Sequence, residues 1–195
     1  MECKIMIVGV GGQGTLLASR ILGEFAIANG LDCKLSEVHG MSQRGGSVVT
    51  YVKMGERVYS PTLTEGTADV VLAFEQLEGA RWANYVKPDG AIVANVQKIM
   101  PMPVLFGAAE YPIDLIERMH KYTPNVNLID AQALAKEAGN IKAVNVVMIG
   151  YLTKLLNLDC EKMLAALRAS VPEKFLTLNE RAFSLGYNAE TKGEH

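Results

Sequence analysis

A run of closely spaced glycines near the start of the chain has the pattern of a phosphate-binding turn. Residues 9–14, GVGGQG, contain the motif G-x-G-x-x-G. Glycines at this spacing let the backbone turn tightly between a strand and a helix, where the first amides of the helix offer unpaired N–H groups to an anion. The pattern predicts a phosphate or nucleotide-like ligand held by Gly9, Gly11, Gly12, Gln13, Gly14 and Thr15. The alternative is that these glycines only allow close packing of the helix on the strand.

A second polar segment, EVHGMSQRGGS (residues 37–47), combines groups suited to recognising an anion. Its glycines permit conformations that bring the backbone close to a large ligand. Arg44 offers a planar guanidinium to a phosphate or carboxylate, and His39 can donate or accept a hydrogen bond near neutral pH. We predict a recognition loop, with His39 and Arg44 as the catalytic candidates. Its binding residues would be His39, Ser42, Gln43, Arg44, Gly45 and Gly46. A solvated connection with an incidental histidine is the alternative.

An acidic residue beside this segment raises the hypothesis of a dinucleotide site. In such sites a carboxylate about twenty residues beyond the glycine turn binds a ribose hydroxyl, and Glu37 lies near that place. After Glu37, however, the chain continues into the polar segment and then a β-rich run, where a dinucleotide fold would have a crossover helix. A self-sufficient NAD(P)-dependent oxidoreductase therefore remains the less favoured interpretation.

Strand-like and helical segments alternate along the chain, which indicates an α/β fold. Short apolar runs predict buried strands at residues 4–10, 68–74, 90–96 and 125–131, and residues 33–38 predict a further strand that ends at the second polar segment. Apolar residues at helical spacing predict helices from Gln13 to Asn29 and from Gln76 to Tyr85. We expect a Rossmann-like open sheet, mostly parallel and flanked by helices. Both polar segments should lie at the carboxyl ends of its strands, where such sheets bind ligands.

Two segments depart from this alternation. Residues 47–61 hold two β-rich runs around residues 53–56, KMGE, which predicts an antiparallel hairpin. Three prolines between residues 97 and 114 predict an irregular crossing with at most one short strand, near Val104 to Phe106.

The last third of the chain is predicted to be helical. Residues 144–158 are apolar almost all round, so this helix should be buried on every side. Asn145 lies on its edge and is expected to satisfy a buried polar group or to cap the helix. Two amphipathic helices follow, the second opened by Pro172. We expect a single domain over residues 1–186 and a frayed polar tail over residues 187–195.

Composition and charge exclude several classes of protein. The 195 residues include 19 basic and 21 acidic side chains and carry a formal net charge of −2, which gives no footprint for nucleic acid or an anionic membrane. Three cysteines lie far apart without a C-x-x-C pair, so no metal or cluster site is predicted within this chain. The odd cysteine count and a start with neither a signal-peptide nor a membrane-span pattern predict a cytoplasmic protein.

Two stretches taken together resemble a known family. VGVGGQGTLLASRIL followed by SEVHGMSQRGGSVVTYVK is similar to the γ-type domain of the 2-oxoacid:ferredoxin oxidoreductases, above all to the two-subunit indolepyruvate branch. The similarity covers most of the chain, including ADVVLAFEQLEGAR and the helical C-terminal part. The two glycine-bearing motifs in tandem are specific, whereas either one alone would not be.

The resemblance implies an enzyme subunit that is inactive alone. Members of this family cleave a 2-oxoacid oxidatively with coenzyme A, giving an acyl-CoA, carbon dioxide and reduced ferredoxin. The cofactors of the reaction are thiamine diphosphate, its Mg²⁺ ion and iron–sulfur clusters. This chain has neither a cysteine spacing for a cluster nor Gly-Asp-Gly followed by asparagine, so these cofactors are expected in the large (alpha) partner subunit.

The resemblance also implies a role for the two polar segments at the subunit interface. There they would help to seat coenzyme A or close over the 2-oxoacid. Arg44 would pair with a phosphate or carboxylate, and His39 would bond a carbonyl or cofactor group. A non-catalytic assembly role within the same complex is the further alternative.

Overall fold

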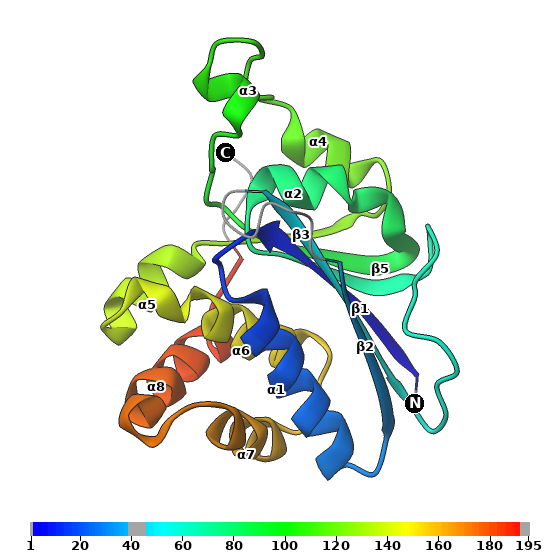
Figure 1. Cartoon of the computed structure of the whole chain (residues 1–195), viewed down its shortest axis with the longest axis vertical. Coiled ribbons are helices and arrows are strands. Elements are labelled where there is room, and N and C mark those ends of the chain that lie inside the picture. The colour runs from blue at the N-terminus through cyan, green and yellow to red at the C-terminus, as the bar shows by residue number, and fades with distance from the viewer. Residues whose placement is uncertain (1, 39–45, 192–195) are drawn as a thin grey trace.

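A six-stranded mixed sheet forms the centre of the fold (Figure 1). The computed structural model describes residues 2–38 and 46–191. The strand order across the sheet is β2-β3-β1-β4-β5-β6. The strands are β1 (Cys3–Val10), β2 (Asp32–Val38), β3 (Ser47–Gly55), β4 (Ala68–Ala73), β5 (Val86–Asn95) and β6 (Asn125–Ile129). Among the strands of these described residues, β3 alone runs opposite to the other five, so the expectation of an open, mostly parallel sheet is confirmed.

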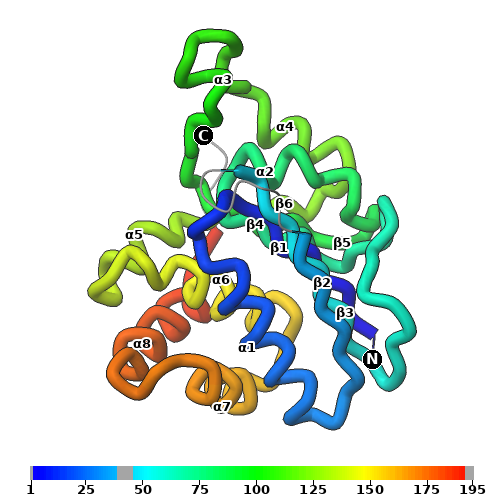
Figure 2. The backbone as a smooth tube through the Cα atoms, in the orientation of Figure 1, coloured from blue at the N-terminus to red at the C-terminus, as the bar shows by residue number. Residues whose placement is uncertain are grey.

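Helices cover both faces of the sheet, as the tube in Figure 2 also shows. One face carries α1 (Thr15–Ala28), α5 (Ala131–Ala138), α6 (Val144–Leu155), α7 (Cys160–Ser170) and α8 (Leu176–Tyr187). The other face carries α2 (Gln76–Arg81) and α4 (Leu115–His120). The remaining short elements are α3 (Met102–Leu105) and the 3₁₀ turns η1 (Ala83–Tyr85), η2 (Ile141–Ala143) and η3 (Glu173–Phe175).

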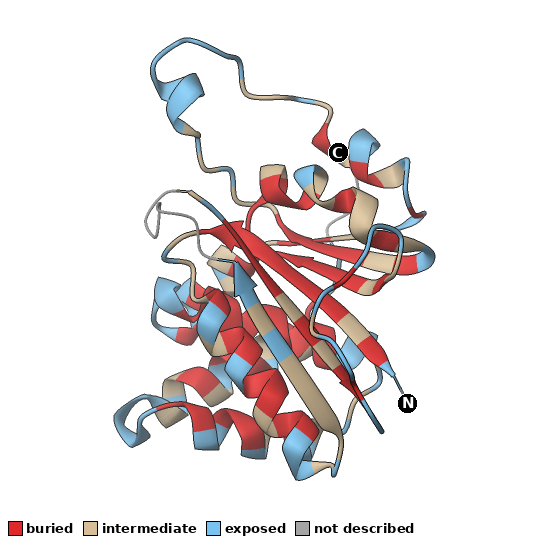
Figure 3. Cartoon of the chain, turned by 45° about the vertical axis from the view of Figure 1, so that its right-hand side comes forward, coloured by how far each residue is buried: buried red, intermediate tan, exposed pale blue. Residues whose placement is uncertain are grey.

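Two hydrophobic cores lie on the two faces because side chains alternate along each strand. On β1, Ile5 and Ile7 pack into the core shared with α1 and α6, whereas Met6 and Val8 pack into the core beneath α2 and α4. All four side chains are fully buried, and Figure 3 shows burial along the central strands. The continuous apolar run of the sequence is therefore explained by a strand that is covered on both sides.

The apolar helix α6 is buried along most of its length, from Val144 to Thr153, which confirms the expectation from its sequence. Its closest neighbour is α8, and the two helices approach through glycine. A Cβ atom on Gly186 would overlap the carbonyl of Val147, and one on Gly150 would overlap the carbonyl of Phe183. The absence of a side chain at these two positions therefore sets how closely α6 and α8 pack.

The predicted hairpin over residues 47–61 is wrong. A single strand, β3, occupies Ser47–Gly55, and it pairs with β2 on one edge and β1 on the other. Because both edges of β3 are taken, residues 56–67 cannot pair with β3 as the second strand of a hairpin. They leave the sheet as an irregular segment that is held by the amide of Val58, which donates to Asp32 Oδ2 at 2.9 Å. The antiparallel partner of β3 in chain order is instead β2.

The predicted short strand near Val104 to Phe106 is also wrong, because residues 102–105 form helix α3. Pro101 caps this helix and Pro103 lies in its first turn. The first N–H groups of a helix have no partner within the helix, so a proline there costs no hydrogen bond. The start of the predicted tail adjoins α8. Tyr187 ends α8, and Ala189 is buried and accepts a hydrogen bond from Lys154.

Within residues 2–38 and 46–191, no helix has both the length and the apolar character that crossing a bilayer requires.

Candidate functional site at the carboxyl edge of the sheet

The two glycine segments meet at one edge of the sheet. β1 ends at Val10 and β3 begins at Ser47, and these two residues are partners in the antiparallel register. The residues just outside the pair continue the contact, because Gly11 N donates to Gly46 O at 2.9 Å. Since the other four strands run parallel to β1, this edge is the one where the carboxyl ends of β1 and those four strands lie. The structure therefore brings the glycine turn and the end of the predicted recognition loop together.

The rest of that loop falls outside the described part of the chain. The predicted site residues concerned are His39, Ser42, Gln43, Arg44 and Gly45. Their roles stay predictions, whereas Gly9, Gly11, Gly12, Gln13, Gly14, Thr15 and Gly46 can be placed.

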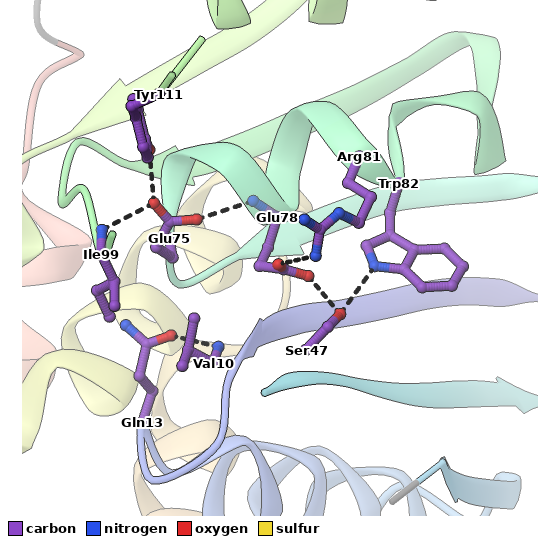
Figure 4. A network of polar contacts seen from close by, with 9 residues as sticks. All are labelled: Val10, Gln13, Ser47, Glu75, Glu78, Arg81, Trp82, Ile99 and Tyr111. Atoms are coloured by element: carbon purple, nitrogen blue, oxygen red, sulfur yellow. Dashed lines mark hydrogen bonds and ion pairs between the residues drawn. The ribbon is translucent and has the colours of Figure 1, made fainter. Parts of the chain in front are cut away.

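The side chain of Gln13 occupies the crevice between the ends of β1 and β4. The helices that follow these two strands, α1 and α2, lie on opposite faces, so the crevice is the switch point at which open sheets bind ligands. Gln13 Oε1 accepts from Val10 N at 2.7 Å (Figure 4), and Gln13 Nε2 donates to Phe74 O at 3.0 Å. Nε2 also lies 3.2 Å from Gln97 Oε1. The chain thus uses the amide of Gln13 to hold its own turn.

Gly14 links the turn to α6. Its φ angle of 83° is in the left-handed region, which favours glycine, and a Cβ atom would overlap the side-chain amide of Asn145. Asn145 Nδ2 donates to Gly14 O at 3.1 Å, so of its two expected roles Asn145 satisfies a partly buried polar group and does not cap α6. Thr15 then begins α1, whose cap provides no side-chain hydrogen bond. The first N–H groups of α1 are therefore unpaired within the helix.

A pocket of about 430 Å³ opens beside the glycine turn. Gly12 and Gly14 line it on one side, and Gln132, Ile141, Lys142 and Val144 line it on the other. Lys142 is the cationic residue of this lining and is exposed. A phosphate or carboxylate would meet an ammonium group and the positive end of α1 there. Sequence reasoning missed Lys142, because nothing in its local pattern separates it from the other lysines.

A second polar network fastens the start of α2 to the same edge (Figure 4). Glu75 caps α2 by accepting from Glu78 N at 2.9 Å. Its other oxygen accepts from Ile99 N at 3.1 Å and from the hydroxyl of Tyr111 at 2.8 Å. Burial raises the pKa of Tyr111, and the hydrogen bond to Glu75 adds to the rise. Three donors thus satisfy this buried carboxylate, which therefore orders the edge of the sheet.

Glu78 is the second buried acid of this network. Ser47 Oγ donates to one of its oxygens and Arg81 pairs with the other. Burial raises the pKa of Glu78, while the bond from Ser47 and the charge of Arg81 oppose the rise. Trp82 Nε1 donates to Ser47 Oγ at 3.4 Å, so the residue after Gly46 is held from two sides.

The geometry disfavours a dinucleotide site. Glu37 lies near the end of β2, and β3 separates β2 from β1. Neighbouring strands are about 4.8 Å apart, so Glu37 stands two strand spacings from the strand that carries the glycine turn. Ser19 Oγ on α1 donates to Glu37 Oε1 at 3.3 Å. The structure therefore does not bring Glu37 to the turn, and Gln13 fills the crevice that such a ligand would enter.

Across residues 2–38 and 46–191, no three His, Cys, Asp or Glu side chains come together as metal ligands. Burial raises the pKa of Cys3 to about 12, so its thiol stays protonated and is not a nucleophile.

Comparisons with known proteins identify the family. The model of the family described as pyruvate ferredoxin/flavodoxin oxidoreductase matches residues 4–189. A protein of Thermococcus kodakarensis named indolepyruvate oxidoreductase subunit IorB is 44% identical over 193 residues, which are 96% of each chain. A protein of the same name from Archaeoglobus fulgidus is 38% identical over 197 residues, covering 99% of this chain and 98% of the relative.

Solved structures share the fold. The gamma subunit of a keto/oxoacid ferredoxin oxidoreductase from Geobacter sulfurreducens has a TM-score of 0.71 at 24% identity, with 95% of this chain and 96% of that chain covered. The 2-oxoglutarate:ferredoxin oxidoreductase of Magnetococcus marinus, solved with 2-oxoglutarate, coenzyme A and succinyl-CoA, has a TM-score of 0.74 at 21% identity, with 95% of this chain and 30% of that chain covered. From the family match and the close relatives, the chain belongs to the pyruvate ferredoxin/flavodoxin oxidoreductase family.

Proposed function

We propose that this chain is the small subunit of a 2-oxoacid:ferredoxin oxidoreductase that acts on indolepyruvate or another aryl 2-oxoacid. The proposal is supported by relatives that carry the name indolepyruvate oxidoreductase subunit and match almost their whole length at 38–44% identity. The complex would convert the 2-oxoacid and coenzyme A to an acyl-CoA and carbon dioxide, and two ferredoxins would each accept one electron.

In this proposal the cofactors belong to the larger subunit. Thiamine diphosphate with Mg²⁺ supplies the carbanion chemistry there, and iron–sulfur clusters carry electrons away singly. The small subunit binds and positions. Its glycine turn would face the active site of the larger subunit, together with the loop that holds the predicted residues His39 and Arg44.

The observation that carries this assignment is the hydrogen bond between Gly11 and Gly46 beside an open pocket. It joins the two motifs at the edge of the sheet where α/β folds bind ligands. The pocket would receive a phosphate group of coenzyme A against Lys142 and the first amides of α1. A similarly folded protein, the Magnetococcus marinus enzyme, was solved with coenzyme A bound. The larger subunit would cover the rest of the ligand.

The test is a reconstituted complex that carries Lys142→Ala, with Lys136→Ala on α5 as the control. Both lysines are exposed, but Lys136 does not line the pocket. Loss of a charged hydrogen bond to phosphate should raise the KM for coenzyme A about tenfold and leave the KM for the 2-oxoacid unchanged. The control should match wild type. An unchanged KM for coenzyme A in Lys142→Ala would remove coenzyme A from this pocket.

The same assay with Arg44→Ala tests the loop. A complex that assembles normally but depends abnormally on coenzyme A or the 2-oxoacid would support a role at the active site. A complex that fails to assemble, or assembles poorly with normal activity per complex, would favour the assembly role.

A further inference from the structure

Residues 98–113 leave the body of the fold between β5 and α4, and we name them the α3 arm. In Figures 1 and 3 the helix α3 stands away from both helical layers, and none of its residues is buried. The large apolar side chains exposed on the α3 arm are Met100, Met102, Leu105 (64%), Phe106 (76%) and Ile113 (98%). Clustered apolar exposure of this kind marks a surface that another molecule covers.

Hydrogen bonds within the α3 arm hold the shape of its tip. Phe106 N donates to Met102 O at 3.0 Å, and Ala108 N donates to Pro103 O at 2.8 Å. Gly107 ends the helix with a φ of 72°, in the left-handed region. Prolines at positions 101, 103 and 112 further restrict the backbone. The α3 arm is thus ordered before it meets a partner, which lowers the conformational entropy lost on binding.

One buried carboxylate anchors both limbs of the α3 arm. Ile99 N on the outgoing limb and the Tyr111 hydroxyl on the returning limb donate to the same oxygen of Glu75, a residue only 1% exposed. Lys98 Nζ lies 5.9 Å from the centre of the Tyr111 ring, a cation–π contact across the base. The base of the α3 arm is therefore fixed to Glu75, while its tip projects from the body of the fold.

The base of the α3 arm adjoins the candidate site. Gln97, the residue before the α3 arm, lines the pocket and bonds to Gln13 of the glycine turn. Gln97 O also accepts from Gln76 N at 3.0 Å, which ties the base to α2. A partner that covers the edge of the pocket would therefore also lie against the base of the α3 arm.

We infer that the α3 arm docks against an apolar surface of the larger subunit, beside the candidate site. Residues 99–109, IMPMPVLFGAA, contain no charged side chain, so the contacting surface must also be apolar. A second copy of this chain seated on the α3 arm would lie across the edge that the larger subunit has to reach. The inference rests on the proposed function, because that function places the larger subunit at this edge.

The experiment compares two double variants for binding to the purified larger subunit. Leu105→Ser/Phe106→Ser removes the apolar tip. Ile27→Ser/Tyr59→Ser removes one aliphatic and one aromatic side chain of similar exposure, 67% and 82%, outside the α3 arm. Thermal unfolding of each isolated variant checks that the fold persists. Anchors of this kind carry much of an interface's affinity, so the tip variant should bind about tenfold or more weakly, and the control should stay within about twofold of wild type.

Equal binding by the tip variant and wild type would overturn the inference. So would an equal loss in both double variants, or a loss confined to self-association of the isolated chain in sedimentation. Failure of the wild-type chain to bind the larger subunit would instead refute the proposed function, and the inference would fall with it. Wild-type binding with an unaffected tip variant would refute the inference alone.

Discussion

Gly11 and Gly46 are 35 residues apart in the sequence, yet the amide of Gly11 donates to the carbonyl of Gly46 at 2.9 Å. This contact exists because β3 lies antiparallel beside β1 and starts where β1 ends. Two motifs that would be unspecific separately thereby become one surface. Each residue that holds this surface in place can be tested separately.

Gln13 should matter first for stability. Its amide accepts from Val10 N and donates to Phe74 O, and a partly buried hydrogen bond contributes about 1 kcal/mol. We expect Gln13→Ala to lower the free energy of unfolding by about 1–3 kcal/mol in urea titrations. Gln13→Glu should lower the free energy of unfolding at least as much, because a carboxylate oxygen would replace Nε2, which now faces Phe74 O and Gln97 Oε1. If both variants unfold like wild type, Gln13 does not hold the turn.

Gly14 and Asn145 should be energetically coupled. Alanine at Gly14 is strained by the φ of 83° and also overlaps the Asn145 side chain. Asn145→Ala removes that overlap but leaves the strain, which costs about 1–2 kcal/mol. The double variant should therefore lose less stability than the sum of the single variants, by about 1 kcal/mol in a double-mutant cycle. Strict additivity would show that the overlap relaxes elsewhere.

Glu78 should make stability depend on pH. Burial raises its pKa in the folded state above the ordinary value of 4.5. The folded protein therefore keeps this proton to higher pH than the unfolded chain does. The contribution of this protonation to the free energy of unfolding is fully present below pH 4.5 and is lost as the pH rises through the raised pKa. Glu78→Gln keeps the shape but does not titrate. The free energy of unfolding of wild type minus that of Glu78→Gln should fall as the pH increases from about 4 to about 8.

A flat difference across that range would mean that Ser47 and Arg81 fully offset the burial of Glu78. A difference that increases with pH would show that these two partners dominate, so that the pKa of Glu78 is lowered and not raised.

Tyr111 should fasten the returning limb of the α3 arm. Tyr111→Phe removes the hydroxyl that donates to Glu75 at 2.8 Å, and a hydrogen bond to a charged group contributes about 1.5–3 kcal/mol. We expect the Ile99 amide, which shares that oxygen, to exchange with solvent about tenfold faster or more. Tyr122→Phe at an exposed position provides the control. Equal exchange in wild type and Tyr111→Phe would mean that Glu75 holds the outgoing limb alone.

Patterns that burial imposes were readable from the sequence. The apolar run of β1 reflects burial on both faces, the helical spacing of apolar residues in α1 reflects burial on one face, and the apolar sequence of α6 reflects burial all round. The structure contains all three elements. The sequence of residues 47–55 predicts a strand correctly, but the predicted second strand of a hairpin after it is wrong. No local sequence signal shows that both edges of a strand are already paired. Pairing across the sheet decides that point.

The site was readable only in part for the same reason. Glycine spacing marked the turn, and Asn145 stood out as a polar residue in an apolar helix. Lys142 and Glu75 gave no such signal, since their importance comes from which elements the fold places beside them. α3 was misassigned because its prolines read as breakers, whereas at the start of a helix they are compatible with it.

Hydrogen–deuterium exchange of this chain, alone and bound to the larger subunit, tests the central claim most directly. Binding should slow exchange at Gly12, Thr15 and Leu16 and leave residues 86–91 and 123–127, at the opposite edge of the sheet, unchanged. Slower exchange at that opposite edge, with no change at the glycine turn, would contradict the proposal that the larger subunit covers the glycine turn.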